Sequence, residues 1–147
     1  MQFTFGVQKS KPPAPAKPTR GEAERWQIWK STTSGREYRV RVDKDRFLAD
    51  WANIPPEAAK HGAYIHTECR RAGAKWIGTS RVFLPCAKAG KAEGKTTNVC
   101  HITLRFEVDS ITPQKITGGG DILRDFDCEK CEVRRTDWGS FVWVPKR

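Results

Sequence analysis

Two four-residue segments place potential metal ligands at the same spacing. Residues 66–69 read His-Thr-Glu-Cys and residues 128–131 read Cys-Glu-Lys-Cys, so each segment offers two ligands separated by two positions. In both, an aromatic residue stands two places before the first ligand, and six residues separate the second ligand from a tryptophan. A tight turn of this length aims both side chains at one point, and a structural zinc ion takes four such ligands. The spacing therefore predicts one structural Zn²⁺ per chain, bound by His66, Cys69, Cys128 and Cys131.

Other cysteines leave alternatives open. Either Cys86 or Cys100 could replace His66 or Cys69 as a ligand, and together with His101 they could form a second half-site. If they bind no metal, we expect both to be free buried thiols, which are common in protein cores. Five cysteines in a reducing compartment favour metal binding over disulfides, so a chain without metal is the last alternative.

The charge balance points to a polyanionic partner. The formal net charge is +10 and the isoelectric point is about 9.7, as is typical of proteins that contact nucleic-acid phosphates. We therefore predict nucleic-acid binding, DNA or RNA, through basic side chains on strands, on the two ligand segments and in a lysine-rich loop. These residues are Arg39, Arg41, Arg70, Arg71, Lys88, Lys91, Lys95, Arg134 and Arg135. The alternative is a small basic interaction module, such as an inhibitor or adaptor, that docks on an acidic protein surface.

The chain is organised as one domain behind a basic arm. Residues 1–19 are rich in Pro, Ala and Lys and predict an extended arm, while residues 20–147 suffice for a single modest core. No run of 18 apolar residues predicts a membrane span, and the first residues do not match a signal peptide. The sequence therefore predicts a cytoplasmic protein in a reducing compartment.

Hydrophobic periodicity predicts an α+β fold of antiparallel hairpins with short helices, clamped by the zinc site. Residues 36–42 alternate strictly between apolar and charged side chains, which indicates a strand. The apolar spacing within residues 43–52 predicts a short amphipathic helix, and Pro55-Pro56 predicts the start of another. The predicted elements are a hairpin at 25–30 and 36–42, helices at 43–52 and 56–60, a long hairpin at 76–84 and 99–108, a flexible joint at 117–121, a helical turn at 121–126 and a last strand at 138–144.

Catalytic motifs do not support an enzyme. The sequence lacks the signatures of serine hydrolases, zinc proteases and kinases. A zinc deaminase needs H-x-E followed by P-C-x-x-C, but Asp127 stands where the proline should precede Cys128. A metal nuclease site among Glu107, Asp109 and Asp121 stays an open alternative, although their spacing is not diagnostic. The Cys3His pair of segments resembles the metal-binding turns of zinc ribbons and treble clefs, and this resemblance implies a non-catalytic scaffold for contacts with nucleic acid or protein.

Overall fold

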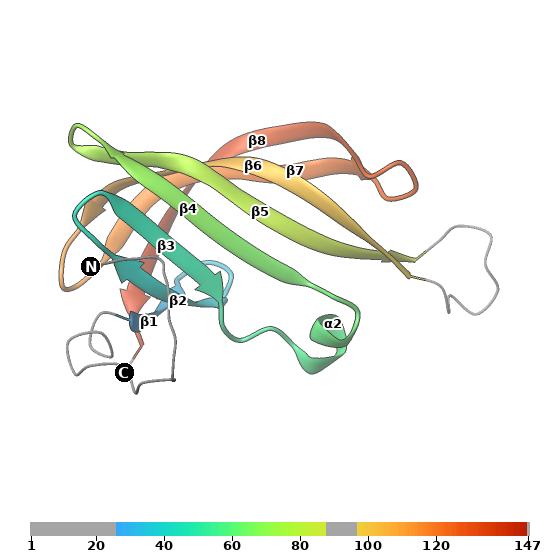
Figure 1. Ribbon diagram of the computed structural model, residues 1–147, viewed down its shortest axis with the longest axis horizontal. Helices are drawn as coiled ribbons and strands as arrows, with labels where there is room; N and C mark the ends of the chain where they lie inside the picture. Colours follow the sequence, from blue (N-terminus) through green and yellow to red (C-terminus); the bar gives the residue numbers. More distant parts are fainter. Residues whose placement is uncertain (1–25, 88–96, 147) are drawn as a thin grey trace, which may run out of the picture.

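The computed structural model describes residues 26–87 and 97–146, and in these ranges eight antiparallel strands close into one barrel (Figure 1). Each strand pairs with the next in the chain, and the last pairs with the first. The strands are β1 (Trp26–Ser31), β2 (Glu37–Val42), β3 (Arg46–Trp51), β4 (Tyr64–Ala72), β5 (Lys75–Ala87), β6 (Thr97–Ile111), β7 (Ile116–Asp127) and β8 (Glu132–Pro145). The fold is thus nearly all β, and the predicted α+β class is wrong.

Strict alternation of side chains places the first hairpin as predicted. Tyr38 and Val40 of β2 point inward and are buried, while Arg39 between them is exposed. β2 pairs with β1 from Trp26 opposite Arg41 to Lys30 opposite Glu37. The period of two in the sequence matches the period at which a barrel strand presents residues to the interior.

The predicted helix at 43–52 is wrong, because its second half is strand β3. Phe47 and Ala49 are fully buried inside the barrel, and Leu48 between them faces outward. β3 pairs with β2 on one side and β4 on the other, so partners distant in the sequence supply its hydrogen bonds. The helix predicted at 56–60 is present as α2 (Pro56–Lys60), a single exposed turn that begins at a proline and leads from β3 to β4.

Glycines let β7 lie close to its neighbours. The predicted flexible joint at 117–121 and helical turn at 121–126 are wrong, because both belong to β7. Gly118 pairs with Val108 of β6 and with Phe141 of β8. A Cβ atom at Gly118 would lie 2.8 Å from the Phe141 ring, closer than any side chain can approach. Glycine is required here because the backbone carbonyl of Glu107 on β6 and the Phe141 ring of β8 together occupy the space of a side chain.

The four longest neighbouring strands form two hairpins that extend beyond the short strands. β5 and β6 pair from Trp76 opposite Val108 to Ala87 opposite Thr97, which confirms the predicted long hairpin. β7 and β8 pair along their whole length, but β6 pairs with β7 only over residues 106–111. Over residues 97–105, β6 no longer pairs with β7. In this region the β5–β6 hairpin and the β7–β8 hairpin run side by side, to the right of the barrel in Figure 1.

The core fills one part of the barrel. It contains ten buried residues, with Phe47, Val108 and Ile116 fully enclosed. Trp143 of β8 belongs to this core and stacks on Tyr38 with ring centroids 4.3 Å apart. The extended hairpins lie beyond this packed region, so their inward-facing side chains have fewer partners.

Candidate ligand-binding cavity and the two disulfides

The first predicted pair of zinc ligands is separated by the strand that carries it. His66 and Cys69 both lie on β4, where residues three apart point to opposite faces. His66 faces outward and its Nδ1 lies 2.6 Å from Oδ1 of Asp50, whereas Cys69 is fully buried in the core. Burial raises the pKa of the Cys69 thiol to about 12, so it stays a neutral core side chain. These two residues cannot share a metal ion.

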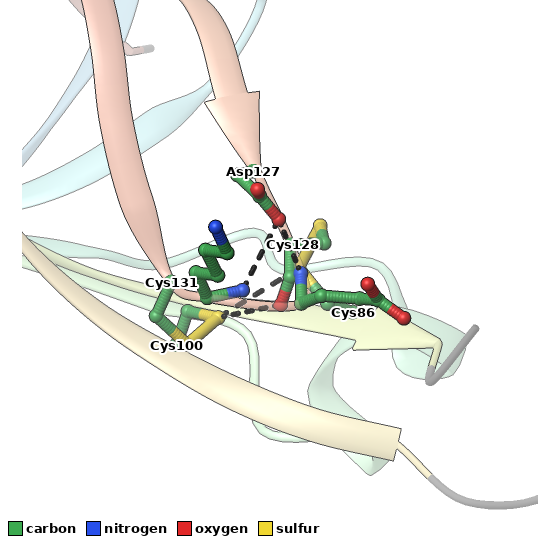
Figure 2. The surroundings of a disulfide bond; sticks show 7 residues. Cys86, Cys100, Asp127, Cys128 and Cys131 are labelled. Carbon is green, nitrogen blue, oxygen red and sulfur yellow. Dashed lines mark hydrogen bonds between the residues drawn. A yellow bond between two sulfur atoms is a disulfide. The ribbon is translucent and has the colours of Figure 1, made fainter.

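The second predicted pair does lie in a tight turn, but its sulfur atoms form disulfides. Cys86 of β5 is bonded to Cys128, and Cys100 of β6 is bonded to Cys131 (Figure 2). Oδ1 of Asp127 accepts hydrogen bonds from the backbone N–H groups of residues 129 and 130, which shapes the turn. The disulfides tie the β7–β8 turn to the end of the β5–β6 hairpin.

The zinc prediction is therefore wrong in its ligands and in the metal itself. Among the residues that the structure describes, no group of three or more His, Cys, Asp or Glu side chains could hold a metal ion. Cys86 and Cys100 are not free thiols, and His101 stacks on Phe83 with ring centroids 4.4 Å apart instead of joining a half-site. Disulfides persist in oxidising compartments, so the predicted reducing cytoplasm is replaced by an oxidising setting.

The basic residues predicted to contact phosphate do not gather in one place. Arg39 and Arg41 lie on the outer face of β2, close to the ring of Trp26. Arg70 and Arg71 lie near the β4–β5 turn, at the opposite end of the long strands from Arg134 and Arg135 (Figure 1). Lys88, Lys91 and Lys95 lie outside the described residues, as do residues 1–19 of the predicted arm.

Several of these arginines are already paired with carboxylates. Arg41 contacts Asp43, Arg134 contacts Asp127 and Arg135 lies near Asp137. Within the described ranges, ion pairs are absent only for Arg39, Arg70 and Arg71 among the six predicted arginines that can be placed. The described residues contain 18 of the 27 Lys and Arg but 14 of the 17 Asp and Glu, so most of the net charge of +10 belongs to the other segments.

A hollow of about 460 Å³ lies between the two long hairpins and the β1–β2 turn. Apolar side chains from β4 to β8 line most of it, and an aromatic cluster forms one wall, with Phe141 4.9 Å from both Phe106 and Trp143. The aliphatic lining residues are Ile65, Val82, Leu84, Ile102, Leu104, Ile122 and Leu123. Most of them are only half-buried, so the cavity exposes an unfilled apolar surface.

A few polar groups stand on the lining of this apolar cavity. Hydroxyls of Ser31, Thr33 and Ser34 come from the β1–β2 turn, and the guanidinium of Arg36 follows directly. Tyr38 is the next inward residue on β2; burial raises its pKa, and the nearby Arg36 partly offsets this effect. On another part of the lining, the Ser80 hydroxyl is bonded to the buried Thr67 hydroxyl at 2.6 Å and has little capacity left for a ligand.

An ion pair marks the fork where β6 and β7 separate. Asp121 accepts a 2.8 Å hydrogen bond from the backbone N–H of Arg105 and a 2.7 Å bond from its guanidinium. These bonds to Arg105 hold the pKa of the Asp121 carboxyl below its ordinary value of 3.8. The backbone of Arg105 has no paired residue on β7. The Asp121 carboxylate accepts the Arg105 backbone N–H instead.

The lowered pKa of Asp121 gives a testable pH dependence. Because the folded chain binds this proton less tightly than the unfolded chain, the ion pair stabilises the fold above the ordinary carboxyl pKa, and this stabilisation is lost as the pH falls through the folded-state value. We expect Asp121→Asn to lower the free energy of unfolding by about 1 kcal/mol at neutral pH and by much less near pH 2. Urea titrations at both pH values measure this, with the exposed Asp125→Asn as control. An equal loss at both pH values would contradict it.

A second, polar hollow of about 420 Å³ lies on the outer face of β4 to β6. His66, Glu68 and Arg81 are among its lining residues, and the His66 ring is held by Asp50 while Glu68 is paired with Arg46 at 2.6 Å. Asp50 also accepts a hydrogen bond from Tyr64, and burial together with this bond raises the Tyr64 pKa to about 12. The His66 and Glu68 side chains are thus satisfied by these partners, whereas Arg70 and Arg81 on the same lining make no ion pair within the described ranges.

The sequence analysis missed the cavity and both disulfides. Residues 82, 84, 102 and 104 do show inward alternation in the sequence, but this pattern cannot tell a filled barrel from a hollow one. The part of the chain that the structure describes has no helix long and apolar enough to cross a membrane. Comparison of the chain with protein-family models, with curated proteins and with solved structures finds no match.

Proposed function

We propose that the protein binds one small, largely apolar molecule in the cavity between its two long hairpins. The observation that carries this proposal is a hollow of about 460 Å³ whose lining contains more aliphatic and aromatic side chains than polar ones. Ligand sites of small molecules commonly measure 300–1,000 Å³ and have this composition. Eight-stranded barrels are also just wide enough to hold a single small ligand.

Two features of the architecture support the proposal. The disulfides join the β7–β8 turn to Cys86 of β5 and Cys100 of β6, so the apolar walls are held in place without a ligand. The half-buried Leu84 and Leu104 would gain burial when a ligand covers them, at about 25 cal/mol for each Å² of apolar surface removed from water. A ligand gains affinity here because it buries apolar surface that is already in place and is not covered by other side chains.

Nucleic-acid binding and docking on an acidic protein surface both stay predictions from the net charge. That the chain is not an enzyme stays a prediction from its sequence motifs. Binding to phosphates would fall steeply with salt, whereas binding in an apolar cavity would change little. Fluorescence anisotropy of single- and double-stranded oligonucleotides across a salt series measures the first. The two kinds of binding involve different surfaces and are separable by the variants described next.

Titration of the full, oxidised chain with N-phenyl-1-naphthylamine, a neutral fluorescent probe, tests the cavity. We expect saturable binding of one probe per chain with strong fluorescence enhancement. Leu104→Trp replaces an aliphatic side chain on the lining with a bulkier indole ring that fills part of the cavity. It should weaken probe binding at least about tenfold. Its neighbour on the same strand faces outward, so Thr103→Trp is the matched control and should bind as the parent does.

Circular dichroism confirms that both tryptophan variants are folded before they are compared. The proposal is overturned if the parent chain shows no saturable probe binding. Equal affinity of Leu104→Trp and the parent would place the probe elsewhere on the protein and would also overturn it.

A further inference from the structure

We infer that the cavity is selective for amphipathic molecules with an anionic head group, such as a carboxylate on an aliphatic chain, and that Arg36 binds this group. The inference rests on the proposed function and adds the chemical class of its ligand. It follows from the charges that line the cavity and from the contacts that hold Arg36 in position.

Among the described residues, the lining of the cavity carries one positive charge without an acidic partner. Its charged side chains are Arg36, Arg105 and Asp121. Arg105 and Asp121 neutralise each other through bonds of 2.7–3.2 Å. Arg36 makes no ion pair with any residue in the described ranges, and the acidic residue next to it in the sequence, Glu37, is paired with Lys146 at 3.0 Å. An anionic ligand is the partner that would balance Arg36 beside an apolar surface.

The side chain of Arg36 is held by an aromatic ring. Its Cζ lies 5.0 Å from the centroid of the Trp51 ring, a distance at which the cation is attracted to the ring face. The Trp51 indole N–H donates a 2.9 Å hydrogen bond to Oδ1 of Asn53, so the ring itself is fixed. Arg36 therefore loses little conformational freedom when it binds a carboxylate, which favours affinity.

The backbone around Arg36 is pinned by the same asparagine. Asn53 Oδ1 accepts a 2.8 Å bond from the N–H of Glu37, and its Nδ2 donates to the carbonyl of Gly35 at 3.2 Å. The N–H of Ser31 donates to the carbonyl of Arg36 at 2.8 Å, which closes the β1–β2 turn. The turn that presents Arg36 and its neighbouring hydroxyls to the cavity is thus built rigidly from both sides.

The location of Arg36 suits a head group. It lies in the exposed β1–β2 turn, whereas the aliphatic lining comes from the long hairpins. A carboxylate at Arg36 stays near water while an attached aliphatic chain covers residues such as Leu104 and Phe106. A ligand of this shape satisfies the charge and the apolar surface together.

Displacement of N-phenyl-1-naphthylamine from the full, oxidised chain by decanoate or by 1-decanol at pH 8 tests the inference. We expect decanoate to bind the parent chain more tightly than 1-decanol. Arg36→Gln should weaken decanoate binding about tenfold or more and leave 1-decanol unchanged. Arg36→Lys should restore part of the loss. Arg39→Gln, an outward arginine on the adjoining strand β2, is the matched control and should have no effect.

The outcomes separate this inference from the proposed function. If decanoate and 1-decanol bind equally and Arg36→Gln changes neither, the cavity binds apolar molecules without a preference for anions, and only the inference fails. If Arg39→Gln weakens decanoate as much as Arg36→Gln does, a general charge effect accounts for binding and the inference also fails. If neither compound displaces the probe and the probe itself does not bind, both proposals are overturned.

Discussion

A chain in which Cys86, Cys100, Cys128 and Cys131 are all replaced by alanine is expected to unfold at a much lower urea concentration than the native chain. The disulfides span 42 and 31 residues, and closing loops of this size stabilises a fold by about 3–4 kcal/mol each. Because Sγ of Cys86 and Sγ of Cys100 lie only 3.9 Å apart, the two links restrain the same point and their effects do not add fully. We expect a total loss of at least about 4 kcal/mol, a large fraction of the stability of a domain this size.

The same variant should lose probe binding in the cavity under conditions in which the hydrophobic core is still folded. Without the links, β5 stays paired with β4 as far as Phe83, whereas the β7–β8 turn is held by its own hairpin and by the short β6–β7 contact near residues 106–111. We therefore expect weaker binding of N-phenyl-1-naphthylamine under conditions in which circular dichroism still reports a folded barrel. Cys69→Ala removes the remaining cysteine without removing a link and is the control for cavity binding.

Counting thiols decides whether the pairing is right. Alkylation of the native, unreduced chain in denaturant should label one cysteine, Cys69, and alkylation after reduction should label all five. Peptide mapping should recover the pairs 86–128 and 100–131. Five labelled cysteines in the unreduced chain, or a different pairing, would show that the hairpin tips are not held as the structure has them.

Local patterns were sufficient for some strands and ambiguous for others. The alternation of residues 36–42 has one reading, and β2 lies where it predicts. The spacing of Phe47, Leu48 and Trp51 fits a helix, but Phe47, Ala49 and Trp51 fit the inward face of a strand equally well. Pairing with β2 and β4 favours the strand over the helix. The local spacing of apolar residues does not predict such contacts between distant residues. Gly118 to Gly120 looked like a joint for the same reason, since the aromatic rings that require glycine come from other strands.

The candidate site was harder to predict than the fold. The spacing of His66 and Cys69 suggests a metal pair only if the chain turns there, and in an extended strand the same spacing separates the two side chains. Cysteine pairing depends on the three-dimensional approach of two hairpins, so the sequence leaves many connectivities open. Arg36 belongs to a turn between two strands, and only the closed barrel places it beside Leu104 and Phe106 at one cavity. A site assembled from seven strands has no contiguous motif.

Phe47→Ala is expected to be the most destabilising single substitution of a core residue in β3. The ring is fully buried and lies within 6.3 Å of Phe106 and Trp143, measured between ring centroids. Deleting a buried phenylalanine costs about 3–5 kcal/mol, because the apolar contacts are lost and a cavity remains. We expect the midpoint of thermal unfolding of the oxidised chain to fall by more than about 10 °C. The control is Ile77→Ala, an aliphatic residue that is 47% exposed on the outer face of β5 and should change the midpoint little. If both variants melt alike, Phe47 does not face the interior, and the inward register of β3, which also places Ala49 in the core, is wrong.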